Sequence, residues 1–144
     1  MAGESWAWRV VGISKAALEA LAKNDFRYVK GTVCRAHIVD RIDTAGTIFK
    51  TKTNSPIPRE EFFSLYFEND QTVITTKSEN KAGSRVASYI PIDAERGLFP
   101  AKAIAWKHGR AERDYLRSLY AEQAKERMQI GAASSDCRLE EMIQ

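Results

Sequence analysis

Segments with helical patterns and segments with strand patterns follow one another along this chain without regular alternation. Residues 32–39 and 72–76 have strand patterns, because β-branched residues are frequent in both. Residues 15–23 and 110–128 instead have apolar residues at helical spacing. A doubly wound fold would need strands and helices in regular alternation, so the pattern predicts an α+β fold. We expect a small antiparallel sheet built on the two strands and packed by helices.

A third helix is predicted after residue 57. Pro58 suits the first helical position, and Glu60 and Glu61 suit the first turn. Four aromatic residues follow at helical spacing: Phe62, Phe63, Tyr66 and Phe67. This spacing predicts that the aromatic group belongs to the core and packs on the sheet.

The remaining segments complete one domain. Ser14 is a suitable cap for the first helix. A short helix is expected over 43–50, and further strands over 86–92 and 101–107. The chain is long enough for one ordinary domain, which we place at residues 1–130, and the small, polar residues 131–144 are expected to form a frayed tail.

The composition excludes several classes of protein. With 44% hydrophobic and 28% charged residues, the chain is typical of globular and not of disordered proteins. It has no apolar run long enough to span a membrane and no signal-peptide pattern, so we expect a cytoplasmic protein without a membrane partner. Its two cysteines form no metal-binding motif and no disulfide framework.

The basic residues are unevenly distributed. The net charge is +3, which slightly favours polyanionic partners. One concentration of lysine and arginine surrounds His37, and it includes Arg35 and Arg41. The second consists of Lys107 and of Arg110, Arg113 and Arg117, which share a helix face. Two candidate contact surfaces for DNA, or for RNA, are therefore predicted.

No common catalytic motif is present. The chain has no glycine-rich phosphate loop, no GxSxG nucleophile elbow and no HExxH zinc motif. What remains is the strand Arg35-Ala36-His37-Ile38-Val39, followed downstream by Thr72–Thr76 and by Lys77-Ser78-Glu79-Asn80. A histidine near one strand end, then a strand running into a helix start with asparagine, resembles the ββα-metal (HNH-like) endonucleases.

This resemblance implies a metal-dependent endonuclease that hydrolyses DNA. His37 would be the general base, Asn80 would hold a divalent cation such as Mg²⁺, and Arg35 or Arg41 would contact the phosphate. An imidazole can accept a proton from water at neutral pH, and amide oxygen is a ligand that Mg²⁺ accepts. The sequence departs from the family at Ala36, where many members carry a further ligand.

Two other classes stay open. The chain could be a non-catalytic nucleic-acid-binding module, such as a phage or plasmid regulator, that uses the face formed by Arg110, Arg113 and Arg117. It could also be an interaction protein that forms a homodimer through its C-terminal helix and contacts no nucleic acid. His37 on a half-buried strand is equally compatible with a structural hydrogen bond.

Overall fold

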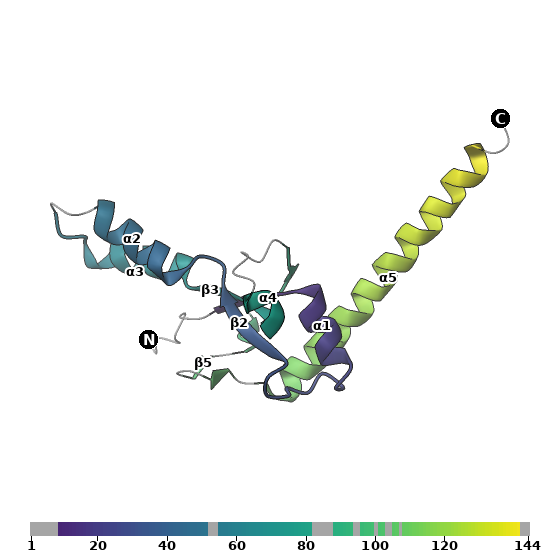
Figure 1. Cartoon of the computed structure of the whole chain (residues 1–144), viewed down its shortest axis with the longest axis horizontal. Helices are drawn as coiled ribbons and strands as arrows, with labels where there is room; N and C mark the ends of the chain where they lie inside the picture. The colour runs from purple at the N-terminus through teal and green to yellow at the C-terminus, as the bar shows by residue number, and fades with distance from the viewer. Residues whose placement is uncertain are drawn as a thin grey trace.

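A four-stranded mixed sheet forms the centre of the molecule (Figure 1). The computed structural model describes residues 9–51, 55–81, 88–93, 96–99, 101–102, 105–106 and 108–141. Strands lie in the order β2-β3-β1-β4. Their bounds are Val33–His37 for β2, Gln71–Thr76 for β3, Arg9–Ile13 for β1 and Ile90–Pro91 for β4. The prediction of an α+β fold is confirmed.

Strand β3 is central to the sheet because it pairs on both edges. It runs parallel to β1, with Arg9 beside Gln71, and antiparallel to β2. In the antiparallel pair, His37 lies opposite Thr72 and Val33 opposite Thr76. The two strands that the alternation of β-branched residues predicts therefore pair with each other in one antiparallel ladder.

Helix α1 (Lys15–Ala22) begins where the sequence predicts. The Ser14 hydroxyl accepts a hydrogen bond from the Ala17 backbone N–H at 3.1 Å. The same hydroxyl donates to Glu79 Oε2 at 2.8 Å, and this oxygen also accepts from the Thr76 backbone N–H. Glu79 belongs to the short helix α4 (Lys77–Lys81), so its carboxylate links the start of α1 to the end of β3.

The core lies between the sheet, α1 and the first turns of the long helix α5 (Arg110–Glu141). Helix α5 extends beyond this core, away from the sheet, and helical backbone continues over residues that the sequence analysis assigned to a frayed tail (Figure 1). Every side chain from Lys125 to Ile130 is exposed. The buried core comprises Val10, Ile13, Leu18, Leu21, Ile74, Leu116 and further apolar residues.

Helices α2 (Arg41–Thr51) and α3 (Arg59–Asn69) pack side by side as a hairpin that projects from the sheet (Figure 1). None of the residues of α3 is buried. The prediction that its aromatic residues belong to the core is therefore wrong. Phe63 and Phe67 lie on one side of α3, and Phe62 and Tyr66 lie about 100° around the helix. Because the hairpin projects from the sheet, neither pair belongs to the core.

The remaining strands are shorter than predicted. Of the strand expected over 86–92, the described part forms only β4. The strand expected over 101–107 is instead a two-stranded antiparallel pair, β5 (Ala101–Lys102) with β6 (Ala105–Trp106). In the part of the chain that the structure describes, no helix has the length and apolar character needed to cross a membrane.

Candidate functional site

Three of the residues predicted for the catalytic site surround the carboxylate of Asp70. Asp70 follows α3 directly, its side chain is only 3% exposed, and its backbone N–H donates to the Tyr66 carbonyl. His37 Nε2 lies 2.9 Å from Asp70 Oδ1, and Arg41 Nη2 lies 3.6 Å from the same oxygen. Burial lowers the pKa of Arg35, and the negative charge of Asp70 opposes that shift. Asp70 thus provides the negative charge that balances this basic group.

The predicted metal ligand is not part of this cluster. Asn80 lies in α4, beyond the end of β3 where Thr76 faces Val33, whereas His37 faces Thr72 at the other end. The ladder between Thr72 and Thr76 is about 13 Å long at the usual rise per residue. The structure therefore does not bring His37 and Asn80 to one metal–phosphate site. Among the described residues, no group of three or more His, Cys, Asp or Glu side chains could hold a metal ion.

Arg117 in the predicted nucleic-acid face has a structural role. Its guanidinium contacts Asp25 at 2.9 Å and Asp114 at 3.0 Å, and it lies over the ring of Phe26. The hydrogen bond to Asp25 is the main cause of a raised Arg117 pKa. These contacts of Arg117 connect the turn after α1 to α5.

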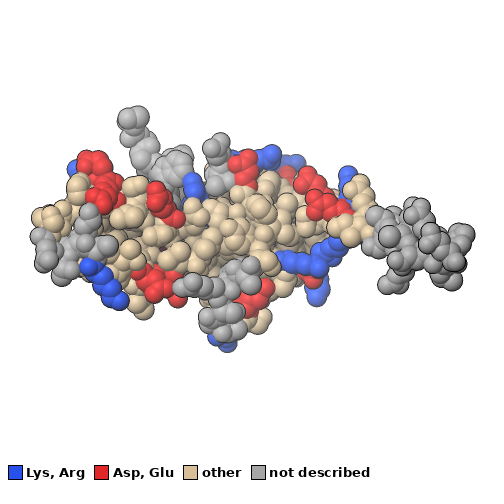
Figure 2. All heavy atoms as spheres, turned by 90° about the horizontal axis from the view of Figure 1, so that it is seen from above, with Lys and Arg blue, Asp and Glu red and all other residues tan. Residues whose placement is uncertain are grey.

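In the part of the chain that the structure describes, the other residues of the predicted basic face do not form a continuous positive surface. Arg110 lies 3.7 Å from Asp114, which Arg117 shares. Arg113 is half-buried, and Lys107 lies outside the described residues. On the face drawn in Figure 2, lysine and arginine atoms are interspersed with aspartate and glutamate atoms. Helical spacing alone therefore predicted a basic stripe whose charges are partly neutralised by neighbouring carboxylates.

The exposed aromatic side of α3 is a feature that the sequence analysis assigned to the core. Phe63 and Phe67 stack at a centroid distance of 5.8 Å, yet 40% and 37% of their surfaces are exposed. The Arg59 guanidinium lies over the Phe63 ring at 5.7 Å, and Glu68 accepts a hydrogen bond from Ser64. We call this surface the outer face of the hairpin: Arg59, Phe63, Ser64 and Phe67.

A groove with a volume of about 200 Å³ lies between α2 and α3. Its walls are mainly apolar, and the stacked rings of Phe62 and Tyr66 form one of them. Its polar end contains Asp70 and Arg41, so the groove opens beside the cluster around His37. We call it the hairpin groove, and it is lined by Arg41, Thr44, Ala45, Ile48, Phe49, Phe62, Tyr66, Asn69 and Asp70.

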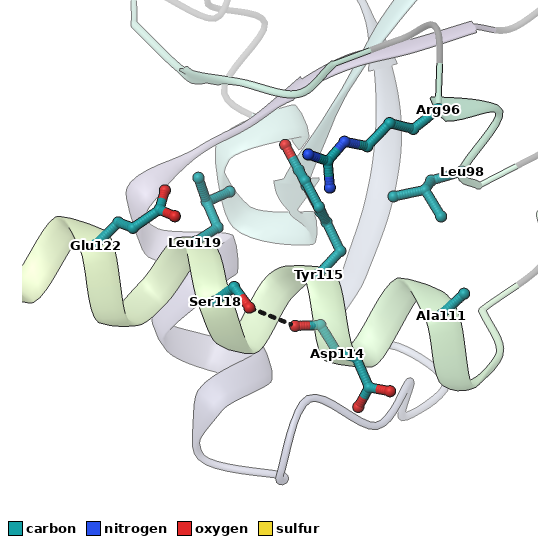
Figure 3. Close-up of a pocket in the computed structure, with 8 residues that line it drawn as sticks. All are labelled: Arg96, Leu98, Ala111, Asp114, Tyr115, Ser118, Leu119 and Glu122. Atoms are coloured by element: carbon teal, nitrogen blue, oxygen red, sulfur yellow. Dashed lines mark hydrogen bonds between the residues drawn. The ribbon is translucent and has the colours of Figure 1, made fainter.

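A second, wider cleft follows α5 and has a volume of about 560 Å³ (Figure 3). Arg96 lies over the ring of Tyr115 at 5.2 Å and contacts Asp93 at 3.4 Å. The Ser118 hydroxyl donates to the backbone carbonyl of Asp114. These polar groups bind one another, and among the described residues that line the cleft no chemically reactive combination is present.

Asp70 and the exposed aromatic surface are the two features that the sequence analysis missed. The sequence analysis assigns Asp70 no role, although a carboxylate placed directly before a buried strand is a candidate partner for a strand histidine. For the aromatic residues, no local signal indicates that the hairpin projects from the sheet. Comparison with protein-family models, with curated proteins and with solved structures gives no match for this chain.

Proposed function

We propose that this protein is an interaction protein that self-associates through the outer face of its α2–α3 hairpin. The observation that carries the proposal is that α3 has aromatic residues on two sides and buries none of them. A helix that is apolar around most of its circumference is ordinarily covered by protein. A contiguous apolar surface on a projecting element is typical of a site for another protein.

A second copy of the chain is the partner that fits this face. Two α3 helices can pack antiparallel about a two-fold axis that passes beside Leu65. In such a pair, residue 63 of each copy faces residue 67 of the other, so the two Phe63–Phe67 stacks would cover each other at the centre. A two-fold contact of this kind needs a self-complementary surface, and the outer face has one.

The C-terminal helix is the other surface predicted to form a homodimer. In its described turns from Lys125 to Ile130 the side chains are mostly polar, apart from Met128 and Ile130. The outer face of the hairpin presents two stacked aromatic rings whose surfaces are 40% and 37% exposed. We therefore favour the hairpin over α5 as the dimer contact.

Multi-angle light scattering on the wild type and three variants tests the proposal. We expect a dimer for the wild type and a monomer for Phe63→Glu, because a buried unpaired carboxylate is costly in an apolar contact. Ile42→Glu changes an 84% exposed residue of α2 outside the outer face, and it should remain dimeric. Met128→Glu should also remain dimeric.

Two outcomes would contradict the proposal. One is a wild type that stays monomeric at the highest concentration that scattering can measure. The other is a dimer that Met128→Glu dissociates and Phe63→Glu does not, since this would place the contact on α5. The endonuclease predicted from the sequence stays a prediction.

A further inference from the structure

The hairpin groove combines mainly apolar walls with a half-exposed guanidinium at its polar end. We propose that it is a binding site for a small molecule that has one aromatic ring and one carboxylate. The ring would lie against Phe62 and Tyr66, and the carboxylate would bind Arg41. A ligand site of this kind goes beyond the proposed self-association, which uses the outer face of the hairpin.

The size of the groove limits the class of ligand. Its volume is about 200 Å³. An apolar cavity of about 150 Å³ holds a benzene ring, whereas sites for drug-sized ligands start at about 300 Å³. The groove therefore has room for a single ring with a short side chain, and it is too small to enclose a nucleotide.

The walls of the groove favour an aromatic ring over an aliphatic chain. The rings of Phe62 and Tyr66 are nearly parallel, with an angle of 10° between their planes and 6.3 Å between their centroids. Ala45 and Ile48 line the groove from α2. Aromatic rings pack favourably against one another in offset or edge-to-face contact, so a planar ring gains more from these walls than an aliphatic chain of equal area.

The charge at the polar end favours an anion. Arg41 and Asp70 are the charged residues that line the groove, and their side chains are 50% and 3% exposed. A ligand in the groove therefore meets the guanidinium. This group has several N–H donors in a planar fork, so it can contact Asp70 and also bind a second carboxylate. Asn69, next to Asp70 in the chain, lines the groove as well, and its amide can donate to the same anion.

The carboxylate of Asp70 also selects between anions. Its Oδ1 lies 3.6 Å from Arg41 Nη2, so it is close to any anion that binds this guanidinium. The repulsion between two charges is proportional to their product, so a phosphate monoester is repelled about twice as strongly as a carboxylate. We therefore expect a carboxylate as the ligand and not a phosphate.

Titration of the isotope-labelled full chain with phenylacetate, followed by NMR, tests the proposal. We expect saturable shifts of backbone amide signals from α2 and α3, with a dissociation constant on the order of 1 mM for a ligand of so few atoms. Benzyl alcohol has the ring without the charge, and acetate has the charge without the ring. Each should bind at least about five-fold more weakly, because it lacks either the ion pair or the ring contact. Phenyl phosphate should also bind more weakly than phenylacetate.

Two variants locate the ligand. Arg41→Gln should weaken the binding of phenylacetate about five-fold and leave that of benzyl alcohol unchanged. Its matched control is Arg110→Gln on α5, at a residue that is 90% exposed, which should alter neither. Ala45→Phe fills the groove and should abolish the binding of both compounds. Ile42→Phe adds the same ring to α2 at a residue that does not line the groove, and it should leave binding intact.

Three results would overturn the proposal. One is the absence of saturable shifts in α2 and α3 up to about 10 mM phenylacetate. Another is equal affinity of the wild type for phenylacetate and benzyl alcohol, a comparison that serves even if Arg41→Gln fails to fold. The third is binding that is as strong in Ala45→Phe as in Ile42→Phe. Because light scattering reports the dimer separately, absence of the ligand site leaves the proposed function standing.

Discussion

His37 on β2 and Asp70 at the end of α3 are joined by a 2.9 Å contact between Nε2 and Oδ1, in a position where Asp70 is almost fully buried. Arg41, the first residue of α2, lies 3.6 Å from the same oxygen. The carboxylate at the end of α3 therefore contacts one side chain from the sheet and one from the start of α2. This cluster connects both helices of the hairpin to β2.

Asp70→Asn should destabilise the protein more than most single polar substitutions. The change removes the negative charge that faces His37 and Arg41, and a hydrogen bond to a charged group contributes about 2 kcal/mol. We expect the free energy of unfolding, measured by urea denaturation, to fall by about that amount. Asp93→Asn is the control, since Asp93 is 54% exposed and its ion pair with Arg96 lies at the surface. Equal losses for the two variants would show that the Asp70 cluster does not hold the hairpin.

The sequence predicts those features of the fold that depend on neighbouring residues. The cap at Ser14 and the strand ending at Thr76 follow from local chemistry, and both are found in the structure. The environment of an element depends on distant residues instead. His37 and Asp70 are far apart in the sequence, and their contact exists only because β2 and β3 pair in one particular register. The same register carries Asn80 away from His37, which no spacing in the sequence could indicate.

Glu79 should make the stability of the fold depend on acid pH. Burial tends to raise the pKa of this carboxyl, but hydrogen bonds from Thr76 and Ser14 outweigh it and hold the pKa below its ordinary value of 4.5. A carboxyl with a lowered folded-state pKa stabilises the protein above its unfolded pKa, and this contribution is lost as the pH falls through the folded-state value.

Glu79→Gln is the variant that checks this contribution. It should lower the free energy of unfolding at pH 7 by about 2 kcal/mol, because the hydrogen bonds to a charged acceptor are lost. The difference between wild type and variant should shrink as the pH falls through the lowered folded-state pKa, where the wild-type carboxyl becomes protonated. Urea denaturation from about pH 3 to about pH 7, a range that includes the ordinary glutamate pKa, measures both quantities. A difference that stays constant over this range would mean that Glu79 acts through packing and not through its charge.

Plasmid cleavage separates the proposed interaction protein from the endonuclease that the sequence resembles. In the structure His37 Nε2 contacts Asp70, and Asn80 lies at the other end of the β2–β3 ladder. We therefore expect supercoiled plasmid to stay intact with the wild type in Mg²⁺ or Mn²⁺, as it does with His37→Ala. Asp70→Asn serves as a further control, since it alters the partner of His37 and leaves the imidazole in place. Metal-dependent nicking by the wild type that is abolished in His37→Ala would instead establish His37 as a catalytic base and an endonuclease as the function.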